Sequence, residues 1–108
     1  MAKMERALNG DFNEILNRIE TGIMRGNVSA SLEDSSDFSS GSARCAVRVF
    51  ERYSVIGSNR VSLSVTLFQG GDGAIHLSAI SSGGSQAMFF KLNTFGEQAF
   101  LDKLMKLL

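Results

Sequence analysis

The chain has 108 residues, 44% hydrophobic and 20% charged, which fits a single compact domain over residues 1–108 and excludes a disordered chain. Eleven Lys and Arg balance eleven Asp and Glu, so no net charge draws the protein onto nucleic acid or an anionic membrane. One cysteine excludes an intramolecular disulfide, and no apolar run approaches the ~20 residues of a membrane helix, so the cytoplasm is the expected location.

Residues 2–8 fit two structures, and residues 11–24 fit one. Met4, Ala7 and Leu8 suit a helix, whereas Met4, Arg6 and Leu8 suit one face of a strand, which we favour. From Asp11 onward the apolar side chains recur at helical spacing: Phe12, Ile15, Leu16, Ile19 and Ile23. The spacing of Asp11 and Glu14 is that of a capping box, so an amphipathic helix is expected from there to about Arg25.

After Gly26 the period changes to two, which predicts strands. Val28, Ala30 and Leu32 form the first apolar face, and the polar residues 34–42 predict a loop. In residues 44–52 the expected inward face is Cys45, Val47 and Val49; the expected outward face is Arg44, Ala46, Arg48, Phe50 and Arg52.

The later strands alternate more regularly. Val61, Leu63, Val65 and Leu67 predict a half-buried strand, and Gly70–Gly73 predicts a hairpin turn into a strand containing Ile75, Leu77 and Ala79. Residues 87–92 are a candidate fifth strand of this meander.

The chain closes with a second helix. Thr94 and Glu97 have capping-box spacing and open a helix whose apolar face is Phe100, Leu101, Leu104 and Leu108. The predicted fold is therefore α+β: an antiparallel meander of four to five strands with an N-terminal and a C-terminal helix on one face.

The main candidate site is a polar sheet face. Three arginines recur every fourth residue, at Arg44, Arg48 and Arg52, beside Ser62, Ser64 and His76 if the strands pair in order. Guanidinium and hydroxyl donors match phosphate or carboxylate oxygens, although a solvated face is the simpler interpretation because antiparallel sheets usually have one. Phe50 and Phe68 on this side indicate that a subunit or a ligand covers part of it.

A second candidate site is the loop around Gly83-Gly84. Its backbone amides, with Ser82 and Ser85, could form an anion nest, although a plain strand connection is the simpler interpretation because Gly-Gly-Ser is common in loops. His76 is the one histidine and has no partners at metal-ligand spacing, so no metal, cofactor or catalytic residue is predicted. Arginines and aromatics on a sheet also suit single-stranded nucleic acid, but the zero net charge disfavours it.

Three strings resemble a family of short bacterial single-domain proteins of unknown function: SASLEDSSDF (29–38), RCAVRVFERYS (44–54) and SAISSGGSQAMFFKLNTFGEQAFL (78–101). The element order is more loosely similar to helix-grip proteins of the START and Bet v 1 type, a resemblance that implies a cavity between the sheet and the last helix.

The expected function is that of a non-enzymatic binding or interaction domain, forming a homo-oligomer. It would use the Arg/Ser sheet face or the Gly83-Gly84 loop for a protein partner or a small anion. The alternative is a binder of a small apolar molecule, held between the sheet and the C-terminal helix.

Overall fold

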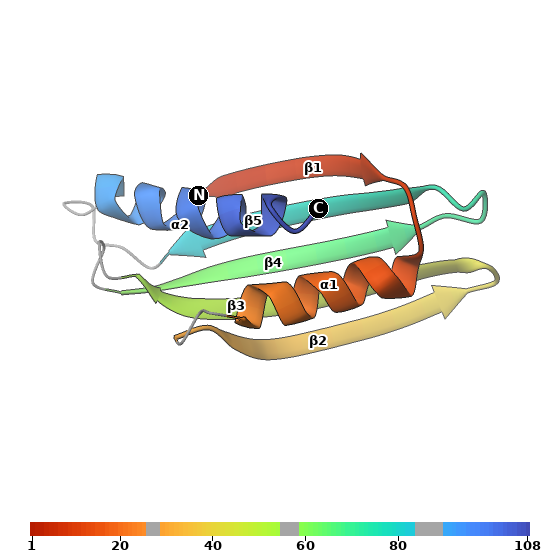
Figure 1. Ribbon diagram of the computed structural model, residues 1–108, viewed down its shortest axis with the longest axis horizontal. Helices are drawn as coiled ribbons and strands as arrows, with labels where there is room; N and C mark the ends of the chain where they lie inside the picture. The colour runs from red at the N-terminus through yellow and green to blue at the C-terminus, as the bar shows by residue number, and fades with distance from the viewer. Residues whose placement is uncertain (26–28, 55–58, 84–89) are drawn as a thin grey trace.

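The computed structural model describes residues 1–25, 29–54, 59–83 and 90–108, which form five strands and two helices. In chain order they are β1 (Ala2–Leu8), α1 (Phe12–Met24), β2 (Ser31–Ser40), β3 (Ala43–Ser54), β4 (Asn59–Gln69), β5 (Ile75–Gly83) and α2 (Phe90–Met105). Both helices lie on one face of the sheet (Figure 1). The predicted α+β class is confirmed, and residues 2–8 are a strand.

The sheet has the order β1-β5-β4-β3-β2, and every neighbouring pair is antiparallel. Strands β2 to β5 form a meander, whereas β1 and β2 occupy opposite edges. Helix α1 connects these two edges by crossing the helix-covered face (Figure 1). The N-terminal strand thus becomes the neighbour of the last strand, a pairing that local periodicity could not have predicted.

Helix α1 forms as its sequence indicates. The Asp11 carboxylate accepts a hydrogen bond from the Glu14 amide at 3.0 Å, which caps one free N–H of the first turn. The apolar stripe Phe12, Ile15, Ile19 and Ile23 is buried against the sheet. The helix ends where expected, with the Arg25 amide bonded to the Thr21 carbonyl.

The core lies between the two helices and the sheet. Strand β4 contributes Val61, Leu63, Val65 and Leu67, and β5 contributes Ile75, Leu77 and Ala79, all at most 2% exposed. Burying each large aliphatic side chain stabilises the fold by about 1.5–3 kcal/mol, so these residues fix which face of the sheet the helices cover.

The prediction of a loop over residues 34–42 is wrong for most of that segment, which is a strand. Strand β2 continues to Ser40, only Gly41 and Ser42 turn, and the strand pairs with β3 along its whole length apart from a bulge between Leu32 and Asp34. Serine and aspartate are typical of turns, but β2 is an edge strand exposed on both sides, so no apolar alternation marks it. Val28, part of the predicted strand face, lies outside the described residues.

Helix α2 begins earlier than predicted. Residues 90–92 are helical and not part of a strand, and Thr94 lies inside the helix. Glu97 therefore cannot serve an N-terminal capping box; its side chain is 4% exposed and accepts a hydrogen bond from the Gly83 amide at 2.8 Å. Phe100, Leu101 and Leu104 are buried as expected.

Candidate functional site

The three arginines of β3 lie on the helix-covered face, which corrects the predicted Arg/Ser surface. Arg48 pairs across the ladder with the buried Val65, and Phe50 with Leu63, so even-numbered residues of β3 point toward the core. The Arg44 guanidinium lies 4.1 Å from the centroid of the Phe12 ring, and that of Arg52 lies 4.5 Å from the Phe100 ring. Both arginines thus cover aromatic rings of the core.

Arg48 is held by two carboxylates. Its Nε donates to Glu20 Oε1 at 3.0 Å, and its Nη1 lies 3.1 Å from Asp37 Oδ1 and donates to the Val47 carbonyl at 2.9 Å. Its side chain joins α1, β3 and β2, and the residue is 8% exposed. An anion would have to displace both carboxylates to bind this guanidinium.

The pKa values of the two inner arginines are shifted in opposite directions, although burial lowers both. Burial by itself lowers the pKa of Arg48, but the hydrogen bonds and charges of Asp37 and Glu20 outweigh it and raise the pKa. Arg52 has an aromatic ring in place of a carboxylate, and burial lowers its pKa. Both remain charged at neutral pH because a guanidinium does not deprotonate there.

The opposite side of the sheet, which we call the open face, carries the predicted polar residues without the arginines. Ser62, Ser64, His76 and Ser82 lie there. Ser62 and Ser64 pair with odd-numbered residues of β3, Ser82 pairs with Ser62, and His76 pairs with Phe68, the partner of Cys45. The hydroxyls of Ser62 and Ser82 lie 2.8 Å apart in a hydrogen bond across β4 and β5. Ser85 and the anion nest proposed for the Gly83-Gly84 loop fall outside the described residues.

The register arranges the centre of the open face in three rows that cross all five strands. The aromatic row is Phe38, Cys45, Phe68, His76 and Ala7. The hydroxyl row is Ser36, Val47, Thr66, Ser78 and Glu5. The charged row is Asp34, Val49, Ser64, Ile80 and Lys3, so its charges stand at the two edges.

Several apolar side chains of the open face meet solvent. Phe38 is 62% exposed, Phe68 43% and Ile80 39%, and Val47 and Val49 are half-buried. Cys45, expected to be a core thiol, lies between the two phenylalanines with a half-buried, free thiol. Both helices occupy the other side of the sheet, so no described element covers this face (Figure 1).

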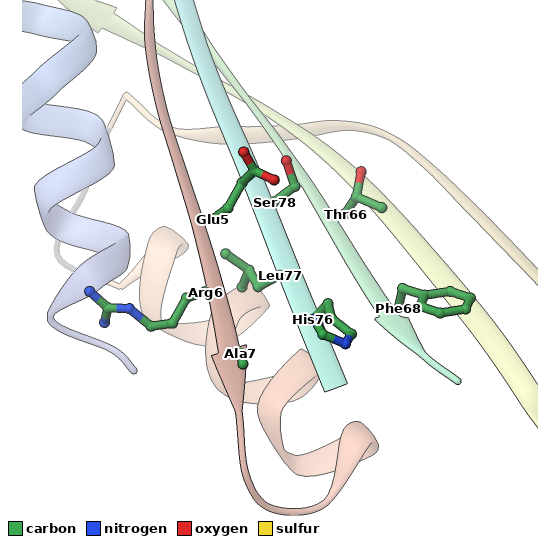
Figure 2. Close-up of a pocket in the computed structure, with 8 residues that line it drawn as sticks. All are labelled: Glu5, Arg6, Ala7, Thr66, Phe68, His76, Leu77 and Ser78. Carbon is green, nitrogen blue, oxygen red and sulfur yellow. The ribbon is translucent and has the colours of Figure 1, made fainter. Parts of the chain in front are cut away.

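A depression of about 340 Å³ lies at the β1 side of the open face. Figure 2 shows Glu5, Thr66, Phe68, His76 and Ser78 extending from this side of the sheet. Arg6 and Leu77 extend toward the helices. The hollow is shallow, with one phenyl ring, one imidazole, two hydroxyls and the Glu5 carboxylate at its surface.

The family of the chain is given by comparison with known proteins. The model of DUF6054, a family of unknown function, matches residues 1–108. The chain belongs to this family. The resemblance to a short single-domain family of unknown function is therefore confirmed, and membership of DUF6054 assigns no activity to any of its residues.

No curated protein and no solved structure matches the chain. The looser helix-grip resemblance therefore has no support from known structures. Within the described residues, no helix is long and apolar enough to cross a membrane, and no group of three His, Cys, Asp or Glu side chains could hold a metal ion.

The sequence analysis missed Phe38 as a surface residue. Phe38 is an isolated apolar residue within the serine- and aspartate-rich segment 34–42, and this was the one sign of its role. Because the segment was predicted to be a loop, Phe38 was assigned to neither face of the sheet. Only pairing with Cys45 places it in the aromatic row.

Proposed function

We propose that the protein is a non-enzymatic interaction domain that binds a polypeptide through its open face. The observation that supports this best is the aromatic row, because Phe38 and Phe68 are 62% and 43% exposed on a sheet face that no described element covers. Aromatic side chains are enriched in protein interfaces, and exposed apolar clusters usually mark contacts.

The charges of the open face favour a polypeptide over an anion. The Lys3 ammonium nitrogen lies 3.4 Å from Glu5 Oε1, and Arg60 Nε donates a hydrogen bond to Glu51 Oε1 at 2.8 Å. Each of these cations therefore has a carboxylate neighbour. The central positions of the three rows are hydroxyl, aliphatic and aromatic residues, apart from Cys45 and His76. A phosphate ligand or a nucleic acid needs free cations, and these described residues offer few.

A binding role also suits the surroundings of His76 better than catalysis does. Its cross-strand neighbours are Phe68 and Ala7, so neither residue paired with it is a carboxylate to orient it or a nucleophile to activate. We therefore assign it a contact role. A cytoplasmic location remains part of the proposal, supported by the free thiol of Cys45.

The alternative function, a binder of an apolar molecule beneath α2, has less support. Phe100 and Leu104 are fully buried and pack in one cluster with Val61 and Leu63. Side chains thus occupy the space that a ligand would need.

Site-specific photo-crosslinking tests the proposed surface. A benzophenone amino acid replaces Phe68 or Phe38 in cells that naturally make the protein, and the control replaces the exposed Arg18 of α1 on the other side of the molecule. We expect polypeptide adducts from both open-face positions and not from the control. Adducts only at the control position, or none at all, would refute an open-face polypeptide partner.

A further inference from the structure

We propose that the polypeptide bound by the open face is a second copy of the same chain, packed face to face with a two-fold axis along β4. This inference rests on the proposed function and names the partner. Closed two-fold dimers are the commonest protein oligomers, and in them one surface must be complementary to itself. The rows of the open face allow that condition to be checked residue by residue.

An axis along β4 exchanges the two halves of the sheet. Strand β1 of one copy then faces β2 of the other, β5 faces β3, and β4 faces itself, because the order is β1-β5-β4-β3-β2. In the charged row Lys3 faces the partner's Asp34, and Ile80 faces the partner's Val49. Packed sheets are rotated by about 30°, which leaves these positions within reach of a lysine side chain.

The same axis matches the aromatic row. Phe68 lies on the axis and meets the partner's Phe68, while Phe38 at the β2 edge lies over the small Ala7 at the β1 edge of the other copy. A large ring opposite a methyl group lets two sheet surfaces interdigitate. The two-fold axis along β4 therefore makes the open faces of the two copies complementary both in charge and in side-chain size.

The other in-plane axis, perpendicular to the strands, is disfavoured. It places β2 against the partner's β2, and this strand carries Glu33 and Asp34 but no lysine or arginine. Its third carboxylate, Asp37, lies on the helix-covered face beside Arg48. Facing carboxylates repel each other; Glu33 is partly neutralised by Arg60, whose Nη2 lies 4.0 Å from its Oε2, so the repulsion falls mainly on Asp34. The distribution of charge thus selects the axis along β4.

The size of the open face also suits a dimer. Five strands spaced by about 4.8 Å are about 24 Å wide, and the residues from Arg60 to Phe68 extend about 31 Å at ~3.4 Å each. The face thus measures roughly 740 Å², close to the ~800 Å² per partner of a standard stable interface.

Pairing of sheet edges is the competing way to form a dimer. The bulge between Leu32 and Asp34 interrupts the β2 edge, and its acidic residues repel a second copy of the same edge. Bulges and charges on edge strands are devices that prevent such pairing. The β2 edge is therefore protected, whereas the open face is not.

Analytical ultracentrifugation over a wide concentration range tests the dimer. We expect a reversible monomer–dimer equilibrium, and we expect Phe68→Asp to raise the dissociation constant by ~100-fold or more, because it places two carboxylates together on the axis. The control is Arg18→Glu, an exposed charge change on α1, and circular dichroism verifies that each variant is folded. A monomer at all concentrations would overturn the second-copy proposal.

A charge exchange tests the axis. Lys3→Glu alone and Asp34→Lys alone should each weaken the dimer by roughly threefold to tenfold, because each places like charges opposite each other. The double variant restores an opposite pair and should recover most of the affinity. No recovery in the double variant, or a dimer insensitive to all these changes, would overturn the arrangement along β4.

Crosslinking separates failure of this inference from failure of the proposed function. Adducts from position 68 with twice the mass of the chain support the dimer. If the chain is monomeric and position 68 crosslinks to a different polypeptide, the second-copy proposal is wrong and the open-face function stands. If neither open-face position crosslinks, the proposed function itself fails.

Discussion

At the scale of single residues, the arginines of β3 show how charge is accommodated beside a core. Arg44 and Arg52 lie over the rings of Phe12 and Phe100, and Arg48 binds two carboxylates. Each aliphatic stem can pack against apolar neighbours while the guanidinium keeps a partner of suitable chemistry. Three residues that were candidates for binding an external anion thus have partners within the fold.

Replacing Arg48 by alanine should lower the free energy of unfolding by about 1–3 kcal/mol, because the ion pairs that join β3 to Glu20 of α1 and to Asp37 of β2 are lost. The control is Arg60→Ala, whose exposed pair with Glu51 should contribute about 0–1 kcal/mol. Urea denaturation measures both values. Equal effects of the two substitutions would contradict a structural role for Arg48.

Glu97 offers a second test at this scale. Its Oε2 accepts from the Gly83 amide, and its Oε1 lies 2.5 Å from the Met1 amino nitrogen, although the contact lacks hydrogen-bond alignment. Glu97→Ala should cost about 1–3 kcal/mol because the buried amide loses its acceptor, and Glu97→Gln should retain part of this stability. The neighbouring Gln98→Ala, at an exposed position, is the control in thermal denaturation. If Gln98→Ala destabilises as much, the buried hydrogen bond is not the cause.

At the scale of elements, β3 shows why its orientation could not be read from its sequence. It has apolar residues on both faces, Ala46 and Phe50 on one and Val47 and Val49 on the other. Assigning the arginines to solvent selected the wrong face. The fully buried Phe50 contributes more burial than either valine does, and the arginines on its side all find partners.

Two phenylalanines that the sequence placed on the same side distinguish the two orientations of β3. Phe50→Ala should cost about 3–5 kcal/mol because it leaves a cavity in the core. Phe68→Ala, at a position 43% exposed, should cost well under half of that. Chemical denaturation at a protein concentration low enough to keep the chain monomeric compares them. Similar costs would mean that β3 is oriented as the sequence analysis predicted.

At the scale of the whole molecule, the two helices cover one face of the sheet and leave the other open. A sheet with only one covered face is common, but this open face carries exposed aromatic and aliphatic residues among its hydroxyls. Its charged row has opposite charges at opposite edges, at Lys3 and Asp34. These features of the open face are the basis of the proposed self-association.

The reactivity of Cys45 tests the proposed dimer, because its half-buried thiol lies between Phe38 and Phe68 on the open face. We expect the rate of its reaction with a thiol reagent to fall as the protein concentration rises through the dimer dissociation constant. The Phe68→Asp variant should react at the rate of the monomer at all concentrations. A rate independent of concentration in a protein shown to dimerise would place the dimer interface elsewhere.

The sequence by itself determined α1 with its Asp11 cap, the core faces of β4 and β5, and the α+β class, because local periodicity and capping depend on neighbours in the chain. Only the tertiary structure decided that residues 34–40 are a strand, that the β3 arginines face the helices, and that β1 pairs with β5. These features depend on which distant segment supplies a hydrogen-bond ladder or a counter-charge. The composition of the open face follows from these features, because its rows of residues form only when the strands pair in register.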